Sequence, residues 1–89
     1  MNAVVSVIGN DQVGILAHVS QALAQYGANI IDVSQTVLGK TFAMIMVVDI
    51  ENLNVTLNSF IDLMKEAGKE KKLEINVMHE DIFNAMHKI

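Results

Sequence analysis

The hydrophobic and polar residues of this chain follow two periods, which predict strands and helices in alternation. Short segments rich in β-branched residues predict four strands, at residues 3–8, 29–37, 41–49 and 73–79. Apolar residues three or four positions apart predict two helices between them. The first repeats through Val13, Leu16, Val19, Leu23 and Tyr26, and the second through Leu57, Phe60, Ile61 and Met64. A short final helix, opening at Asp81, is predicted to carry Ile82, Phe83, Met86 and Ile89 on one side.

Polar residues and glycine are expected to mark the ends of the two longer helices. Asp11 is expected to accept the free backbone N–H groups of the first turn, and Asn52 or Asn54 to do the same for the second helix. Gly68 is expected to stop the second helix, and residues 69–72 then form a solvated connector.

The predicted order is strand, helix, strand, strand, helix, strand, with a hairpin turn at residues 38–40 where Gly39 can adopt a positive φ. This order contains two strand–helix–strand units, which predict an α+β, ferredoxin-like βαββαβ sandwich. Its antiparallel sheet has the strand order 4-1-3-2, and both helices lie on one face. The chain contains no proline, linker-like composition or low-complexity run, so residues 1–89 are predicted to form a single domain with a short C-terminal helix.

This sheet would have an unprotected edge and a second apolar face. The strand at 29–37 lies at the edge and contains no proline or lysine, with Asp32 as its only charge. Asp32 and Gln35 are either exposed polar residues of the edge strand or polar contacts in an interface, and we favour the interface. The third strand is apolar on both sides, which predicts that both faces are covered, in part by the final helix. We therefore expect a homodimer or higher homo-oligomer, formed through the antiparallel pairing of the second strand and through the open sheet face.

The stretch from Gly9 to Leu16 has features that suit a small anion. Gly14 leaves the backbone bare, and the free N–H groups of a helix start attract a carboxylate. The alternative is that Asp11 only caps and Gly14 only packs. Asn29 is expected at the opposite end of the sheet within one chain, but antiparallel pairing of two edge strands moves it toward the Asp11–Gly14 turn of the other chain. Two interfacial pockets are therefore predicted.

Composition argues against several classes of protein. The net charge is −4, the chain has six lysines and no arginine, and no basic patch accompanies its four aromatic residues, so nucleic-acid binding is not expected. No apolar run approaches the roughly 18 residues of a membrane span. The absence of cysteine excludes disulfides, thiolate metal sites and thiol catalysis. The sequence shows no secretion leader, so we expect a cytoplasmic location.

No catalytic or metal-binding pattern is convincing. The spacing of His18, His79 and His87 fixes no metal geometry, and His18 is expected to be solvated or at an interface. Ser34 has no recognisable base or orienting group. Without arginine the chain lacks the phosphate cradle of an acylphosphatase-like hydrolase, and the 9–14 loop is too short and lysine-free to be a P-loop. Met44 and Met46 are interpreted as core residues. We expect neither enzyme activity nor a cofactor.

Four segments together resemble the ACT domain, a small regulatory ligand-binding module. They are Val-Gly-Ile-Leu at 13–16, Val-Ser-Gln-Ala-Leu-Ala at 19–24, Gly-Ala-Asn-Ile at 27–30 and Asp-Val-Ser-Gln at 32–35. They are most similar to the ACT domains of formyltetrahydrofolate deformylase and the glycine-cleavage repressor. Length and tail are similar to stand-alone ACT proteins of bacteria and archaea, and the resemblance covers essentially the whole chain.

The resemblance implies an amino-acid-type ligand held between the loop after the first strand and the second strand of a neighbouring subunit. Asp11 would engage the amino group, the backbone at 13–16 would hold the carboxylate, and Asn29 and Ile30 would close the site from the partner chain. The ligand-binding residues that it implies are Asn10, Asp11, Gln12, Val13, Gly14, Ile15, Leu16, Asn29 and Ile30.

Two positions depart from the family pattern. Val13 stands where many ACT loops have proline, and Gln12 where many have a basic residue. Weaker binding, a different ligand or no ligand thus remain open. The sequence leaves two functions: a homodimeric amino-acid sensor that acts on a metabolic enzyme or regulator, or a dimerisation and interaction module that modulates such a partner without a ligand.

Overall fold

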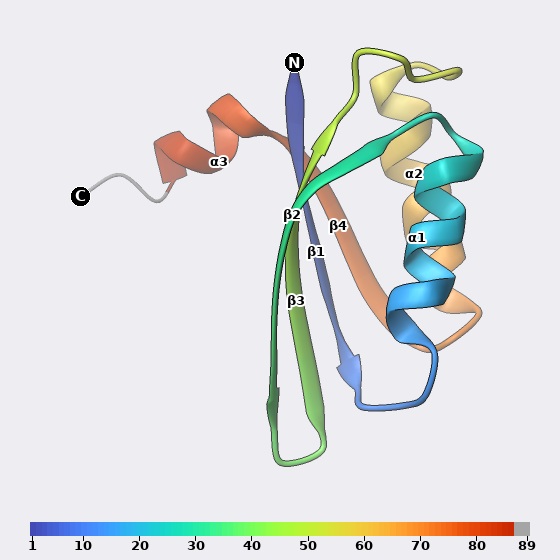
Figure 1. Cartoon of the computed structure of the whole chain (residues 1–89), viewed down its shortest axis with the longest axis vertical. Coiled ribbons are helices and arrows are strands. Elements are labelled where there is room, and N and C mark those ends of the chain that lie inside the picture. The colour runs from blue at the N-terminus through green and yellow to red at the C-terminus, as the bar shows by residue number, and fades with distance from the viewer. Residues whose placement is uncertain (87–89) are drawn as a thin grey trace.

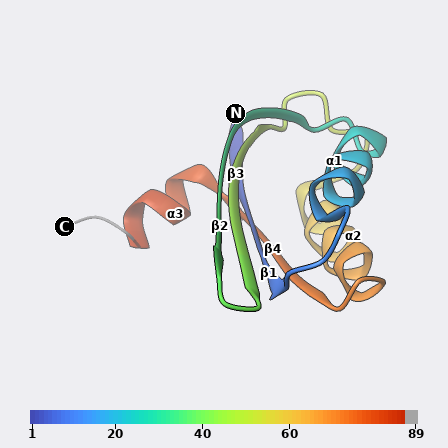
Figure 2. The same cartoon turned by 60° about the horizontal axis from the view of Figure 1, so that its bottom comes forward.

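The computed structural model describes residues 1–86 and arranges them as a sheet with helices on both sides (Figure 1). The elements in chain order are β1 (Asn2–Asn10), α1 (Ile15–Gln25), β2 (Asn29–Leu38), β3 (Thr41–Asp49), α2 (Leu57–Lys69), β4 (Leu73–His79) and α3 (Glu80–Met86). The sheet order is β2-β3-β1-β4, and every neighbouring pair is antiparallel. Helices α1 and α2 cover one face, and α3 lies on the other side (Figure 2). The predicted ferredoxin-like fold and strand order are confirmed.

The core lies between the sheet and the pair α1 and α2. Val5 and Val7 of β1 lie opposite Met46 and Met44 of β3, and all four side chains are buried. Opposed residues share a face because side chains alternate along a strand. Phe60 of α2 packs against this layer and is fully buried. The predicted core role of Met44 and Met46 is confirmed.

The predicted edge strand β2 is exposed along nearly its whole length. All its residues are exposed except Ile30, which is partly buried. Val33 and Val37 lie opposite the buried Met46 and Phe42, yet they remain 36% and 49% exposed. A single chain therefore leaves the apolar residues of β2 uncovered.

In a single chain one face of β3 stays partly open, and its coverage by a second copy stays a prediction. Ile45, on the face away from α1 and α2, is 46% exposed. The final helix α3 packs on β1 and β4. Its seven residues extend for roughly 10 Å, which is too short to cross the whole sheet.

Helix α1 begins later than predicted, and Asp11 does not cap it. The N-cap is Gly14, with φ 86° and no side-chain cap, because the chain makes a left-handed turn there before Ile15. The apolar face is displaced accordingly. The residues that α1 buries are Ile15, Val19, Ala22 and Leu23. Of the predicted positions, Val13 is 98% exposed and Leu16 is 41% exposed.

Helix α2 is capped by neither Asn52 nor Asn54. The Oγ1 atom of Thr56 accepts a hydrogen bond from the N–H of Ser59 at 3.2 Å, so Thr56 is the N-cap. The side-chain amide of Asn54 instead donates to the carbonyl oxygen of Gln25 at 2.9 Å. This bond connects the loop before α2 to the end of α1.

Gly68 does not stop α2, which continues to Lys69. It is buried against β4, and an added Cβ would lie 2.6 Å from the carbonyl oxygen of Leu73. Its lack of a side chain thus permits a close approach of helix and strand. The chain changes direction at Lys72, which has a positive φ of 58°.

Helix α3 follows β4 directly and begins at Glu80, one residue before the predicted Asp81. The N–H of Asp81 donates to Nδ1 of His79 at 3.1 Å. Ile82 and Met86 are exposed, so the predicted apolar side of α3 is only partly packed. The predictions for His87 and Ile89 fall outside the described residues. No helix within residues 1–86 has the length and apolar character needed to cross a membrane.

Candidate functional site

The β1–α1 loop is held at one end of the sheet by two neighbouring turns. The N–H of Asp11 donates to the carbonyl oxygen of Lys40 in the β2–β3 turn at 2.8 Å. The side-chain amide of Gln12 donates to the carbonyl oxygen of Lys71 in the α2–β4 turn at 2.9 Å. The loop is thus positioned from both sides although it contains no proline. Neither contact has a direct signal in the sequence.

The start of α1 presents bare backbone to solvent. A Cβ added at Gly14 would meet no heavy atom within 4 Å, so the space beside this residue is open. The first helical bond runs from the N–H of His18 to the carbonyl oxygen of Gly14 at 2.9 Å. The N–H groups of the preceding residues in the first turn have no helical partner, and no side chain within residues 1–86 caps them. Such a helix start favours an anion.

The side chains around this helix start combine one acid with exposed apolar groups. Asp11 is exposed, so its carboxylate is accessible to a ligand. Val13 and Leu16 are exposed next to it, whereas Ile15 is buried and anchors the loop in the core. A carboxylate, free N–H groups and an apolar border together can receive a molecule that carries both an amino and a carboxyl group.

Asn29 and Ile30 lie at the opposite end of the same chain. Asn29 is opposite Asp49 on β3, which in turn is opposite Asn2 at the start of β1. At the other end of these strands, Asn10 is opposite Thr41. The predicted site residues therefore form two groups, residues 10–16 and residues 29–30, which a single chain does not bring together. Their placement at opposite ends is as predicted.

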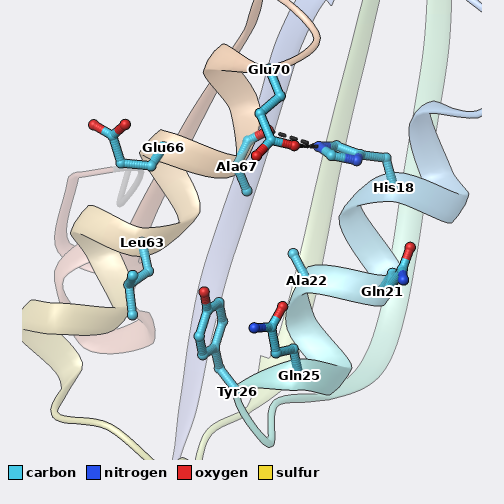
Figure 3. A pocket seen from close by; sticks show the side chains of 9 residues that line it. All are labelled: His18, Gln21, Ala22, Gln25, Tyr26, Leu63, Glu66, Ala67 and Glu70. Atoms are coloured by element: carbon cyan, nitrogen blue, oxygen red, sulfur yellow. Dashed lines mark hydrogen bonds and ion pairs between the residues drawn. The ribbon is translucent and has the colours of Figure 1, made fainter.

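A hollow of about 410 Å³ between α1 and α2 was not predicted (Figure 3). We call it the α1–α2 hollow. Its lining residues are His18, Gln21, Ala22, Gln25, Tyr26, Leu63, Glu66, Ala67 and Glu70. The small side chains of Ala22 and Ala67 leave the space open, and the hydroxyl group of Tyr26 points toward it. The available sequence signal was the polar face of the first helix, formed by residues 18, 21 and 25.

His18 joins the two helices across this hollow. Its Nε2 atom lies 2.7 Å from the carbonyl oxygen of Ala67 and 3.9 Å from a carboxylate oxygen of Glu70. A carbonyl only accepts hydrogen bonds, so Nε2 carries the proton. Ala67 lies in the last turn of α2, where carbonyl groups lack helical donors. The side chain is 19% exposed, so His18 is mostly enclosed rather than solvated in the single chain, and the alternative of an interface position stays a prediction.

Metal-ligating side chains are not gathered in the described part of the chain. Within residues 1–86, no three side chains of histidine, cysteine, aspartate or glutamate come together in an arrangement that could hold a metal ion. His18 instead satisfies a helix carbonyl, and His79 accepts the N–H of Asp81. Both imidazoles thus have local structural partners.

Comparison with known proteins defines the class to which this fold and loop belong. Residues 2–78 match the family model of the ACT domain, and the chain belongs to this family. ACT domains are regulatory ligand-binding domains. The chain is 49% identical over 86 residues to a UPF0237 protein of Methanocaldococcus jannaschii, covering 97% of this chain and 96% of that protein.

Solved structures extend the comparison. An ACT domain protein from Streptococcus pneumoniae is 36% identical, covers 98% of both chains and has a TM-score of 0.83. A formyltetrahydrofolate deformylase from Pseudomonas syringae is 22% identical with a TM-score of 0.78, over 86% of this chain and 26% of its own. A putative glycine cleavage system transcriptional repressor is 24% identical with a TM-score of 0.70, over 86% and 44%. The last two show a shared fold, and the resemblance inferred from the sequence is confirmed.

Proposed function

We propose that this chain is a regulatory domain that binds an amino acid at two equivalent sites in the interface of a homodimer. The observation that carries the proposal is the exposure of β2, which has nine exposed residues out of ten. Antiparallel pairing of β2 with β2 of a second copy would give its backbone groups partners and make one continuous sheet.

This pairing also explains how a site split between two ends of one chain becomes complete. β2 runs from Asn29 to Leu38, and its Leu38 end lies at the same end of the sheet as Asn10. An antiparallel partner strand places its own Asn29 at that end. Asn29 and Ile30 of one copy then approach the β1–α1 loop of the other, and the twofold axis repeats the arrangement.

The proposed ligand follows from the groups at this loop. The N–H groups after Gly14 donate hydrogen bonds to the carboxylate of the ligand, as free helix starts do. The exposed Asp11 side chain pairs with a protonated amino group. Val13 and Leu16 border the apolar part of the ligand, and Asn10 and Gln12 flank the loop. A free amino acid offers both charges one carbon apart.

One observation favours the second candidate, a dimerisation module that acts on a partner metabolic enzyme or regulator without a ligand. The side chain of Gln12 is engaged with Lys71 and, being uncharged, brings no positive charge to the loop. In both candidates the chain acts in the cytoplasm as a non-catalytic domain and the sheet face that α3 leaves open is available for higher assembly.

Calorimetric unfolding with a panel of free amino acids and one-carbon metabolites tests the proposal. A ligand at 100 times its dissociation constant adds about 2.7 kcal/mol to the free energy of unfolding, which raises the melting temperature by several degrees in a domain of this size. The rise should be lost in Asp11→Ala and Asn29→Ala, and light scattering should show both variants as dimers.

Val33→Lys provides the matched interface variant. It places a charge in the centre of the exposed strand and should yield a monomer in light scattering. If no compound of the panel raises the melting temperature and Val33→Lys abolishes the dimer, the results would support the dimerisation module without a ligand. A wild-type protein that is monomeric at all concentrations would refute the interfacial sites altogether.

A further inference from the structure

The free edge of β4 is bordered by a cleft that the proposed amino-acid sites do not use. The cleft has a volume of about 310 Å³ and lies between α2 and β4. We call it the β4 edge cleft. Its lining residues are Lys65 and Lys69 from α2 with Leu73, Glu74, Ile75 and Asn76 at the start of β4. In the sheet, β4 is the last strand and pairs with β1. Its other side therefore presents backbone N–H and C=O groups that an added strand can pair with.

Gly68 explains why the cleft lies directly over this edge. At this residue α2 approaches β4 so closely that an added Cβ would lie 2.6 Å from the carbonyl oxygen of Leu73 and 2.8 Å from Cγ1 of Ile75. Lys65 and Lys69 are four residues apart, so their side chains share one side of the helix. Their aliphatic stems together with Leu73 and Ile75 of β4 supply the apolar part of the lining, and the ammonium groups stay in water.

The charges at the cleft are available to a partner. Lys69 pairs with Glu66 at 3.0 Å, but both side chains are about 70% exposed, and exposed pairs add little stability. Lys65 makes no ion pair with any residue of the described range 1–86. The strand itself contains no lysine or proline, and Glu74 is its one acidic residue. The edge is thus unprotected, and the positive groups beside it come from α2.

We propose that the β4 edge and its cleft form a docking site for an extended segment of a partner protein, in which acidic residues flank an apolar residue at alternate positions. Such a segment adds as a strand, so its backbone pairs with β4 while every second side chain faces α2. The apolar side chain enters the cleft, and the acidic ones meet Lys65 and Lys69. This docking site rests on the proposed function, because a regulatory domain needs a partner protein on which to act. Because β2 and β4 are opposite edges, homodimer formation leaves this site free.

The test uses the whole protein labelled with nitrogen-15 and the synthetic peptide acetyl-Thr-Glu-Thr-Val-Thr-Glu-Thr-amide. Its valine and two glutamates fall on one side of a strand. On titration we expect chemical-shift changes at residues 73–76 and slower hydrogen exchange of β4 amides. A peptide with lysine in place of both glutamates loses both exposed ion pairs and should bind at least about 5-fold more weakly, the factor that corresponds to one such pair. Two further peptides carry N-methyl groups at alternate residues, one on the odd and one on the even positions. They distinguish strand pairing from charge attraction, because only one of them blocks the N–H groups that face β4. That peptide should not bind.

Lys65→Glu and Lys69→Glu should each weaken peptide binding by a similar factor. Lys40→Glu in the β2–β3 turn, at the same end of the sheet but outside the lining of the cleft, makes the same change in net charge and should weaken binding less. Shifts at β2 instead of β4, equal binding of both N-methylated peptides, or equal effects of all three lysine variants would each overturn the proposal. So would a dimer mass that depends on Lys65, since the edge would then serve self-association. The amino-acid response and the Val33-dependent dimer are measured separately, so a failure of the peptide test leaves the proposed function standing.

Discussion

The side-chain amide of Gln12 donates a hydrogen bond to the carbonyl oxygen of Lys71 at 2.9 Å and so ties the β1–α1 loop to the α2–β4 turn. The resemblance to ACT domains implies a basic side chain at this position, and here a neutral amide makes a structural bond instead. The same turn leads into β4 and the β4 edge cleft. Residue 12 therefore links the candidate ligand loop to the part of the molecule that we propose receives a partner.

Removal of this bond should loosen the loop while leaving the fold intact. Gln12→Ala is expected to lower the free energy of unfolding by about 1 kcal/mol, the usual net value of one hydrogen bond. Hydrogen exchange of the amides at residues 11–14 should become faster. Gln21→Ala is the matched control, because Gln21 is an exposed glutamine whose side chain makes no hydrogen bond to a described residue. Equal exchange rates in the two variants would show that the Gln12 bond does not order the loop.

The imidazole of His18 should hold α1 against α2. His18→Ala removes the donor to the Ala67 carbonyl oxygen at 2.7 Å and empties part of a site with 19% exposure. We expect a loss of about 1–2 kcal/mol in urea unfolding, combining a lost hydrogen bond with lost packing. His18→Gln restores an N–H donor and should recover part of the loss. If the two variants are equally stable, the packing of the ring and not the hydrogen bond joins the helices.

Most of the fold could be read from the sequence because hydrophobic periods fix strands and their faces. The bounds of β3 and β4 were predicted to the residue, and β2 was recognised as an unprotected edge. Helix ends were less accurate because several residues can cap a helix, and tertiary contacts decide among them. Asn54 was one of the two predicted caps, but its side-chain amide donates to the carbonyl oxygen of Gln25, and Thr56 caps α2 instead.

The positions of the candidate site residues in the fold were predicted in part, because they depend on the order of the strands. The placement of residues 10–16 and 29–30 at opposite ends followed from strand order alone, and the structure agrees. The contacts of Gln12 with Lys71 and of Asp11 with Lys40 join segments far apart in sequence, and no period or spacing encodes them. The close approach at Gly68 is similar, since a glycine near a helix end also fits a stop.

The cap of α2 gives a direct test of this correction. Thr56→Ala should lower the free energy of unfolding by about 1 kcal/mol, because the N–H of Ser59 loses its side-chain acceptor. Asn52→Ala is the control for the predicted cap that the structure rejects, and it should change stability by less than about 0.5 kcal/mol. Thermal unfolding of both variants under identical conditions decides between them. A larger loss in Asn52→Ala would restore the cap inferred from the sequence.

Alanine variants of two glycines distinguish the effect of backbone strain from an effect on ligand binding. Gly14 and Gly39 have positive φ values of 86° and 62°, and a Cβ at either would meet nothing within 4 Å. Alanine at either position should therefore cost about 1–2 kcal/mol through the left-handed backbone alone, with similar losses in melting temperature. Only Gly14→Ala places a methyl group beside the free N–H groups at the start of α1. Calorimetry with an amino acid that stabilises the wild type should show a reduced or absent shift in Gly14→Ala and a full shift in Gly39→Ala. A full shift in both variants would place the carboxylate of the ligand elsewhere, and a lost shift in both would point to general destabilisation of this end of the sheet.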